Sequence, residues 1–141
     1  MKKIVAIALL MMFTLMVNAQ ERKFSPEKFN ADMEAFITKE ANLTPQEASK
    51  LFPLMREMRE KQRPLYAKMH RIGPNKPADD AACKQAITEY DKLNVELRQL
   101  ESTYHKKMMQ QIPASKVFDV LRAEHRFHRQ AMRGMRKGRP Q

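Results

Sequence analysis

The sequence predicts an all-α fold of four helices, and three observations lead to this prediction. Apolar residues recur at intervals of three and four along most of the chain, which is the spacing that places them on one face of a helix. Of the three glycines, Gly73 falls in a predicted linker, Gly138 in the tail, and Gly134 next to the tail at the end of the last predicted helix. Valine and isoleucine are scarce after the N-terminal segment, and no stretch of useful length alternates apolar and polar residues. We therefore expect helices and no sheet.

The first helix is predicted to begin at Pro26 and to end near residue 40. Ser25 is a favourable N-cap, and proline is well tolerated at the first helical position because its missing N–H would have no partner there. The apolar face of this helix consists of Phe29, Met33, Phe36 and Ile37.

The second helix is predicted from Pro45 to about residue 71. Thr44 and Glu47 have the spacing of a capping box, in which each side chain binds the backbone N–H of the other residue. Its apolar stripe is Leu51, Met55, Met58, Leu65 and Met69, with Gln62 as a polar break. Pro53 and Pro64 lie inside this helix, 11 residues apart and therefore on nearly the same side. Because each proline bends the helix around it, we expect a curved helix.

The third helix is predicted over residues 79–110 and the fourth over residues 113–136. The third would be about 45 Å long, too long for a compact globule of this size, so an elongated hairpin or an oligomer is expected. Its apolar seam consists of Cys83, Ile87, Tyr90, Leu93, Leu97, Leu100, Tyr104 and Met108. The segment 114–120 repeats the segment 48–54 with three differences, and each copy follows a proline at the start of a helix.

The two ends of the chain have distinct compositions. Lys2 and Lys3 precede an apolar run to Val17, and small residues stand three positions and one position before a predicted cleavage point after Ala19. We interpret residues 1–19 as a secretory signal peptide, residues 20–136 as one helical domain, and residues 137–141 as a disordered basic tail. The alternative is a retained membrane anchor, although the run is shorter than a membrane span requires.

Export places the chain in the bacterial periplasm, where nucleic acid is not an expected partner. Two of the 27 Lys and Arg residues lie in the signal peptide, which leaves 25 against 16 acidic residues and a net charge of +9. Such a charge favours membrane surfaces, anionic glycans or acidic protein segments, or it keeps a protein with few apolar residues in solution. Cys83 is the sole cysteine, so we expect it to be buried or to pair between two chains.

The motif Leu43-Thr44-Pro45-Gln46-Glu47, the second helix start at Ile112-Pro113, the signal peptide and the basic helical body together resemble the Spy/CpxP family of periplasmic proteins. That family is known by an LTxxQ motif, usually present twice, and includes chaperones, zinc-responsive envelope proteins and heavy-metal sensors. Glu47 stands where the family usually has Gln, and the second copy has Ile112, Pro113 and Lys116 at the positions of Leu, Thr and Gln. The resemblance implies a thin, curved, dimeric cradle that holds unfolded clients without ATP.

Candidate client-binding residues are arginines and methionines on the second and fourth helices. An arginine ridge attracts acidic partners, and methionine adapts to varied apolar surfaces. The alternatives are a solvated face for the arginines and core packing for the methionines. The candidates are Met55, Arg56, Met58, Arg59, Arg63, Arg122, Arg126, Arg129 and Arg133.

His125 and His128 are three residues apart on one helix and are candidate metal ligands, for zinc or copper, and Glu124 could add an oxygen. Two histidines without a third ligand are more often packing residues, and neighbouring arginines repel a cation. We expect no cofactor. No phosphate-binding loop, nucleophile–base pair or zinc-protease motif is present in the sequence, so we do not expect an enzyme.

The resemblance to the Spy/CpxP family, together with the arginine and methionine pattern, implies an ATP-independent periplasmic chaperone or envelope stress-response protein. Its expected partners are unfolded or aggregation-prone envelope proteins and a second copy of the chain. The alternative is a heavy-metal or envelope-stress sensor that acts on a membrane signalling protein. A binder of membrane surfaces is a third alternative, because the C-terminal tail is so basic.

Overall fold

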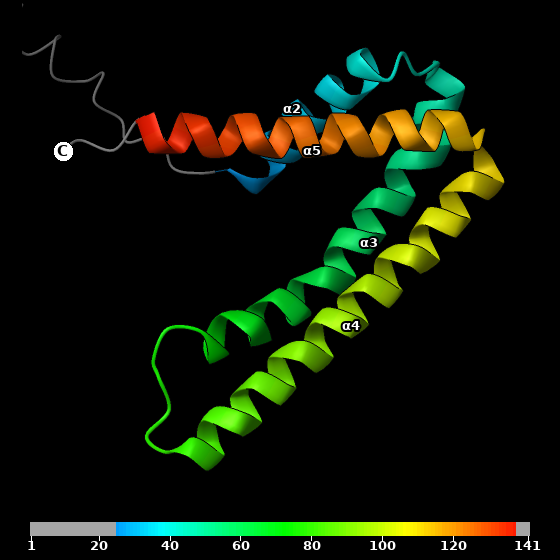
Figure 1. The fold of residues 1–141 in the computed structure, drawn as a ribbon. Coiled ribbons are helices and arrows are strands. Elements are labelled where there is room, and N and C mark those ends of the chain that lie inside the picture. The colour runs from blue at the N-terminus through cyan, green and yellow to red at the C-terminus, as the bar shows by residue number, and fades with distance from the viewer. Residues whose placement is uncertain (1–24, 138–141) are drawn as a thin grey trace, which may run out of the picture. The chain divides into compact units, whose positions relative to one another are not determined.

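The computed structural model describes residues 25–137, and this part of the chain is entirely helical apart from the connections. Residues 1–24 and 138–141 are not described, so the predicted signal peptide, its cleavage after Ala19 and most of the predicted tail lie outside the described residues. The helices are α2 (Pro26–Glu40), α3 (Pro45–Ile72), α4 (Asp80–Gln111) and α5 (Ala114–Lys137) (Figure 1). The all-α prediction is confirmed, and each predicted boundary agrees to within about two residues.

The helix starts follow from local capping chemistry. The hydroxyl of Ser25 accepts a hydrogen bond from the N–H of Lys28 at 3.2 Å and caps α2. The N–H of Thr44 donates to the Glu47 carboxylate at 2.8 Å, and the N–H of Glu47 donates to the Thr44 hydroxyl at 3.2 Å. This is the predicted capping box of α3. Asp79 caps α4 in the same manner by accepting from Ala82 at 2.8 Å.

A tight turn joins α2 directly to α3. The N–H of Leu43 donates to the carbonyl of Thr38, and the N–H of Asn42 donates to that of Lys39, which is the bonding pattern of a Schellman motif. Asn42 has a φ of 48°, a left-handed conformation that asparagine tolerates better than most residues. Leu43 is buried in the same cluster as Ile37, as the motif requires. Leu43 therefore ends one helix while Thr44 begins the next.

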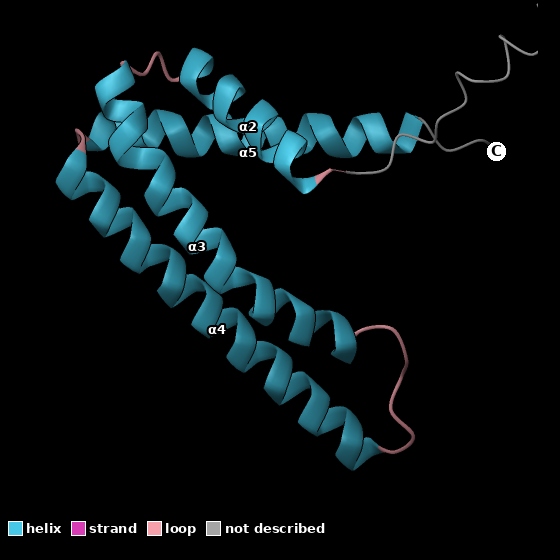
Figure 2. Ribbon diagram, turned by 180° about the vertical axis from the view of Figure 1, so that it is seen from behind, coloured by secondary structure: helices cyan, strands magenta, loops and turns pink. Residues whose placement is uncertain are grey.

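The prolines Pro53 and Pro64 lie inside α3 without ending it. Each lacks the N–H that would bond the carbonyl four residues earlier, on Ser49 and on Glu60 respectively. Both prolines are exposed, so these carbonyls face the solvent side of the helix. The axis of α3 bends along this stretch (Figures 1 and 2), in agreement with the expected curvature.

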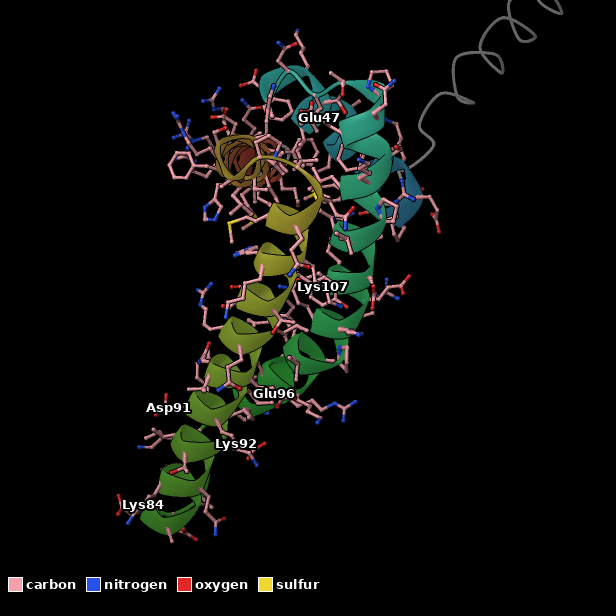
Figure 3. All side chains as sticks on the ribbon, turned by 90° about the vertical axis from the view of Figure 1, so that its right-hand side faces the viewer. Glu47, Lys84, Asp91, Lys92, Glu96 and Lys107 are labelled. Carbon is pink, nitrogen blue, oxygen red and sulfur yellow. The ribbon has the colours of Figure 1, made fainter. Side chains whose placement is uncertain are left out.

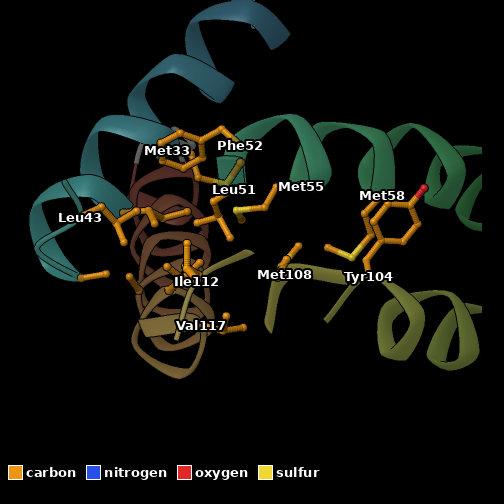
Figure 4. Packing of buried hydrophobic residues seen from close by; sticks show 14 residues of the cluster. Met33, Leu43, Leu51, Phe52, Met55, Met58, Tyr104, Met108, Ile112 and Val117 are labelled. Carbon is orange, nitrogen blue, oxygen red and sulfur yellow. The ribbon is translucent and has the colours of Figure 1, made fainter. Parts of the chain in front are cut away.

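The main core gathers buried side chains from all four helices and from the turn between α2 and α3 (Figure 4). Met33 and Ile37 of α2 are fully buried in it. Facing them are residues of α3, of the end of α4 and of α5. These residues are Leu51, Phe52, Met55, Met58, Tyr104, Met108, Ile112, Val117, Val120 and Ala123.

A smaller cluster joins α3 to α4, which lie side by side (Figure 2). Its buried members are Leu65, Leu93 and Leu97. Met69 and Ile72, the last apolar side chains of α3, pack against this cluster, and α3 ends there. The predicted seam of α4 is therefore covered only in part.

The first turns of α4 are the exposed part of that seam. Ile87 is 63% exposed and Tyr90 is 42% exposed. Cys83 is half-buried, with its thiol 3.8 Å from the carbonyl oxygen of Pro77. The predicted apolar seam is therefore not buried over this segment, where Tyr90 lines an open pocket together with Tyr66 and Met69 of α3.

Candidate binding surface

The two candidate methionines of α3 lie in the core. Met55 is fully buried and Met58 is 4% exposed. Figure 4 shows both beside Tyr104 and Met108 of α4. The prediction that they contact clients is therefore wrong for the described structure, and the alternative of core packing is correct. Met55 and Met58 are three residues apart and therefore lie on the same face of α3, which α4 and α5 cover.

Two of the three candidate arginines of α3 hold helices together. Arg56 donates two hydrogen bonds to the Glu34 carboxylate of α2, at 2.7 and 2.8 Å. This hydrogen bonding raises the pKa of Arg56. Arg59 lies between Glu34, at 3.6 Å, and Glu124 of α5, at 3.8 Å. Burial lowers the pKa of Arg59, and the two carboxylates oppose that effect.

This ionic network changes the interpretation of the second helix as a binding surface. Arg56 and Arg59 join α3 to α2 and to α5, so we assign them a structural role. Arg63 is exposed and has no acidic partner among residues 25–137. Of the candidates on α3, it is the one that remains available to a partner molecule.

The candidate arginines of α5 are mostly available. Arg122, Arg129 and Arg133 are exposed and have no acidic partner among residues 25–137, whereas Arg126 forms an ion pair with Glu40. We call these three residues the arginine ridge. An unpaired guanidinium retains its full capacity to bind a carboxylate or to stack on an aromatic ring.

Exposed apolar side chains lie next to the arginine ridge on the same helix. Phe118 and Met132 are each 61% exposed, and Met135 is 57% exposed. Phe118 lies one turn before Arg122, and Met132 lies one turn after Arg129. Phe118, Met132 and Met135 are not among the binding residues that the sequence pattern predicts. The sequence pattern could have indicated them, because α5 has more apolar residues than fit on one buried face. Val117, Val120 and Ala123 already form that face.

The exposed face of α4 carries charge of both signs and so differs from that of α5. Figure 3 shows Lys84, Asp91, Lys92 and Glu96 along α4, and all four are exposed. Alternating charge is typical of a solvated helix face. The exposed face of α4 therefore lacks the uniform positive charge of the arginine ridge.

The second copy of the motif joins α5 to the turn between α2 and α3. Ile112 is 5% exposed, Pro113 is exposed, and neither residue provides a capping hydroxyl. Lys116, at the position where the motif has Gln, donates from Nζ to the carbonyl of Ala41 at 3.1 Å and to that of Asn42 at 2.8 Å. A cation is favourable at these C-terminal carbonyls of α2. The altered motif therefore still joins helices through its lysine.

We predict that Lys116→Ala lowers the free energy of unfolding by about 1–2 kcal/mol, because two charge-assisted hydrogen bonds are lost. Lys50 occupies the equivalent position in the first repeat and is exposed, so Lys50→Ala is the matched control, with an expected change within about 0.5 kcal/mol. Urea unfolding followed by circular dichroism measures both changes. Equal effects of the two substitutions would contradict this role of Lys116.

His125 and His128 are both exposed on α5. Within residues 25–137, no group of three or more His, Cys, Asp or Glu side chains is arranged to hold a metal ion. This exposure of both side chains does not agree with the alternative that the two histidines are buried packing residues. Two histidines alone offer an incomplete ligand set for zinc, which binds four ligands in structural sites.

Among the described residues, no helix combines the length and hydrophobicity that crossing a membrane requires. Comparison of the chain with protein-family models, with curated proteins and with solved structures finds no match. The resemblance to the Spy/CpxP family thus rests on the motif residues and stays a prediction.

Proposed function

We propose that this protein is an ATP-independent chaperone of the bacterial periplasm that binds unfolded or aggregation-prone envelope proteins on the exposed face of α5. The observation that carries the proposal is the arginine ridge beside exposed Phe118 and Met132. A group of exposed apolar side chains bordered by charged ones is typical of an interaction site. The arginine ridge also differs from the exposed face of α4, where the charges are mixed, and this difference supports the assignment.

Binding would proceed in two stages. The unpaired arginines first attract segments that carry carboxylates, since electrostatic attraction acts over several ångströms and speeds association. Phe118, Met132 and Met135 then contact apolar side chains of the segment. Methionine adapts to many shapes, so sequence selectivity is low. Such contacts form and break at equilibrium, and no nucleotide is needed to release the client.

The proposed location follows from the expected signal peptide over residues 1–19. Export to the periplasm would expose the chain to unfolded envelope proteins after their translocation. We propose that the active form is a homodimer, because the first turns of α4 leave Ile87 and Tyr90 uncovered in a single chain. The motif Leu43-Thr44-Glu47 has the structural role of joining α2 to α3.

We predict that the chain, purified from a periplasmic extract, suppresses aggregation of a chemically unfolded model protein at a near-stoichiometric ratio. Light scattering is followed in low and in moderate salt, with chelator or with zinc, and without nucleotide. Suppression is expected with chelator present and should weaken in salt, because screening reduces attraction to the arginine ridge.

An absence of suppression under every condition would contradict the proposal. Suppression that requires zinc would favour the alternative, a metal-responsive sensor or regulator in which His125 and His128 are central. Zinc binding by the chain, measured by calorimetry, and its loss in a His125→Ala, His128→Ala variant would separate that alternative from general chaperoning.

A further inference from the structure

Residues on the exposed part of α5 are regularly spaced, and a surface that binds unfolded segments without selectivity does not require this regularity. Starting at Phe118, six residues follow one another at intervals of three, four, three, four and three. All of them are exposed except Leu121, which is half-buried. We call this set the α5 seam. Its members are Phe118, Leu121, His125, His128, Met132 and Met135.

Alternating intervals of three and four are the a and d positions of a heptad repeat. Such a stripe is narrow and stays in register with a second helix along its whole length. Residues 118–135 span about 26 Å at about 1.5 Å per residue, or five helical turns. An extended peptide has a side-chain period of two and does not match this spacing. A lipid surface can accept an amphipathic helix without any fixed register, so it does not require a stripe this narrow. The seam therefore favours a helix as its partner.

The charges on the two sides of the seam select the kind of helix. On one side, at the e positions, stand the exposed and unpaired Arg122 and Arg129. On the other side, at the g positions, Val117 is buried, and Glu124 and Ala131 are half-buried within the chain itself. A partner helix that binds the α5 seam can therefore contact exposed charged residues on one side of the seam only, and these residues, Arg122 and Arg129, are positive.

A second copy of α5 does not fit this arrangement. An antiparallel pair of α5 helices would place the arginines of one copy against the arginines of the other, which is destabilising. In a parallel pair, Arg122 and Arg129 of one copy would face the g positions of the other copy. Those positions are already buried or half-buried within that copy. Charge complementarity instead requires carboxylates along the flank of the partner.

We propose that the α5 seam binds an amphipathic helix of another protein that carries apolar residues at heptad spacing and acidic residues along one flank. His125 places a polar group at a central a position, and a polar residue there favours one register of pairing. This inference goes beyond chaperoning, because a folded partner's helix would bind as well as a client segment.

The test uses three labelled synthetic peptides of 21 residues. The first carries Leu at a and d with Glu at e and g, the second replaces every Glu by Lys, and the third has the composition of the first in scrambled order. Fluorescence anisotropy during titration with the purified chain measures Kd, and circular dichroism measures induced helix. We expect the Glu peptide to gain helix and to bind at least about tenfold more tightly than the other two.

Variants assign the binding to the seam. Phe118→Ala together with Met132→Ala should weaken binding of the Glu peptide about tenfold or more. Val95→Ala on α4 removes an apolar side chain that is 56% exposed and that has no assigned role, so it should leave Kd unchanged. Arg122→Glu together with Arg129→Glu should reverse the preference, so that the Lys peptide binds more tightly. Circular dichroism spectra confirm that each variant keeps its helices.

Several results would overturn the inference. Equal binding of the scrambled peptide would show that heptad spacing is irrelevant, and an unchanged preference in the charge-reversed variant would remove the arginines from the site. Binding to vesicles of phosphatidylglycerol without binding to the Glu peptide would assign the surface to lipid. A chain that suppresses aggregation but does not discriminate the peptides keeps the proposed function and loses this inference.

Discussion

Met55→Ala is expected to lower the free energy of unfolding by about 2–5 kcal/mol. Met55 is fully buried at the meeting point of α3, α4 and α5, so truncation loses apolar burial and leaves a cavity that the surrounding helices fill only in part. Denaturation in urea, followed by circular dichroism at 222 nm, measures the loss. For a small helical chain, a change of this size removes a large fraction of the total stability.

Met132→Ala is the matched control, because it removes the same side chain from an exposed position of α5. Its expected effect on the free energy of unfolding is within about 0.5 kcal/mol. Similar effects of the two substitutions would contradict the described core. The opposite pattern is expected for client binding, where Met132 contributes and Met55 does not.

Arg122→Ala together with Arg129→Ala is expected to raise about tenfold the amount of chain that suppresses aggregation by half. These arginines are exposed and unpaired, so their removal costs little stability but takes away the attraction to acidic segments. Light scattering of the unfolded model protein gives the concentration that is required. The remaining suppression should depend less on salt than that of the unmodified chain.

Lys84→Ala together with Lys92→Ala removes the same amount of positive charge from α4, where acidic side chains alternate with basic ones (Figure 3). This control should keep nearly full suppression. If the two double variants lose suppression equally, then net charge rather than the arginine ridge attracts the client, and the assignment to α5 fails.

The helix boundaries could be predicted because the signals that set them are local. The capping box of Thr44 and Glu47 and the N-cap Asp79 need only residues within one turn of each other. The buried face of α3 could be predicted equally well from the periodic spacing of its apolar residues. Leu51, Met55, Met58 and Leu65 of α3 are buried as their spacing predicts.

The binding surface could not be predicted fully, because it depends on what distant segments cover. The two repeats make this clear: Phe52 is 7% exposed, and its equivalent Phe118 is 61% exposed. Their local sequences are nearly identical, and the packing of the other helices decides the difference. The same holds for charge, since Arg126 finds its partner Glu40 across 86 positions of sequence.

Site-specific photocrosslinking to an unfolded client tests most directly the claim that α5 holds it. A photoreactive phenylalanine analogue replaces Phe118 in one variant and Val95 of α4 in another, both at positions more than 50% exposed. We expect strong crosslinks to the unfolded client from position 118, weak ones from position 95, and none to the same protein when it is folded. Crosslinks that are equal at the two positions, or that arise mainly from position 95, would contradict the proposed role of α5.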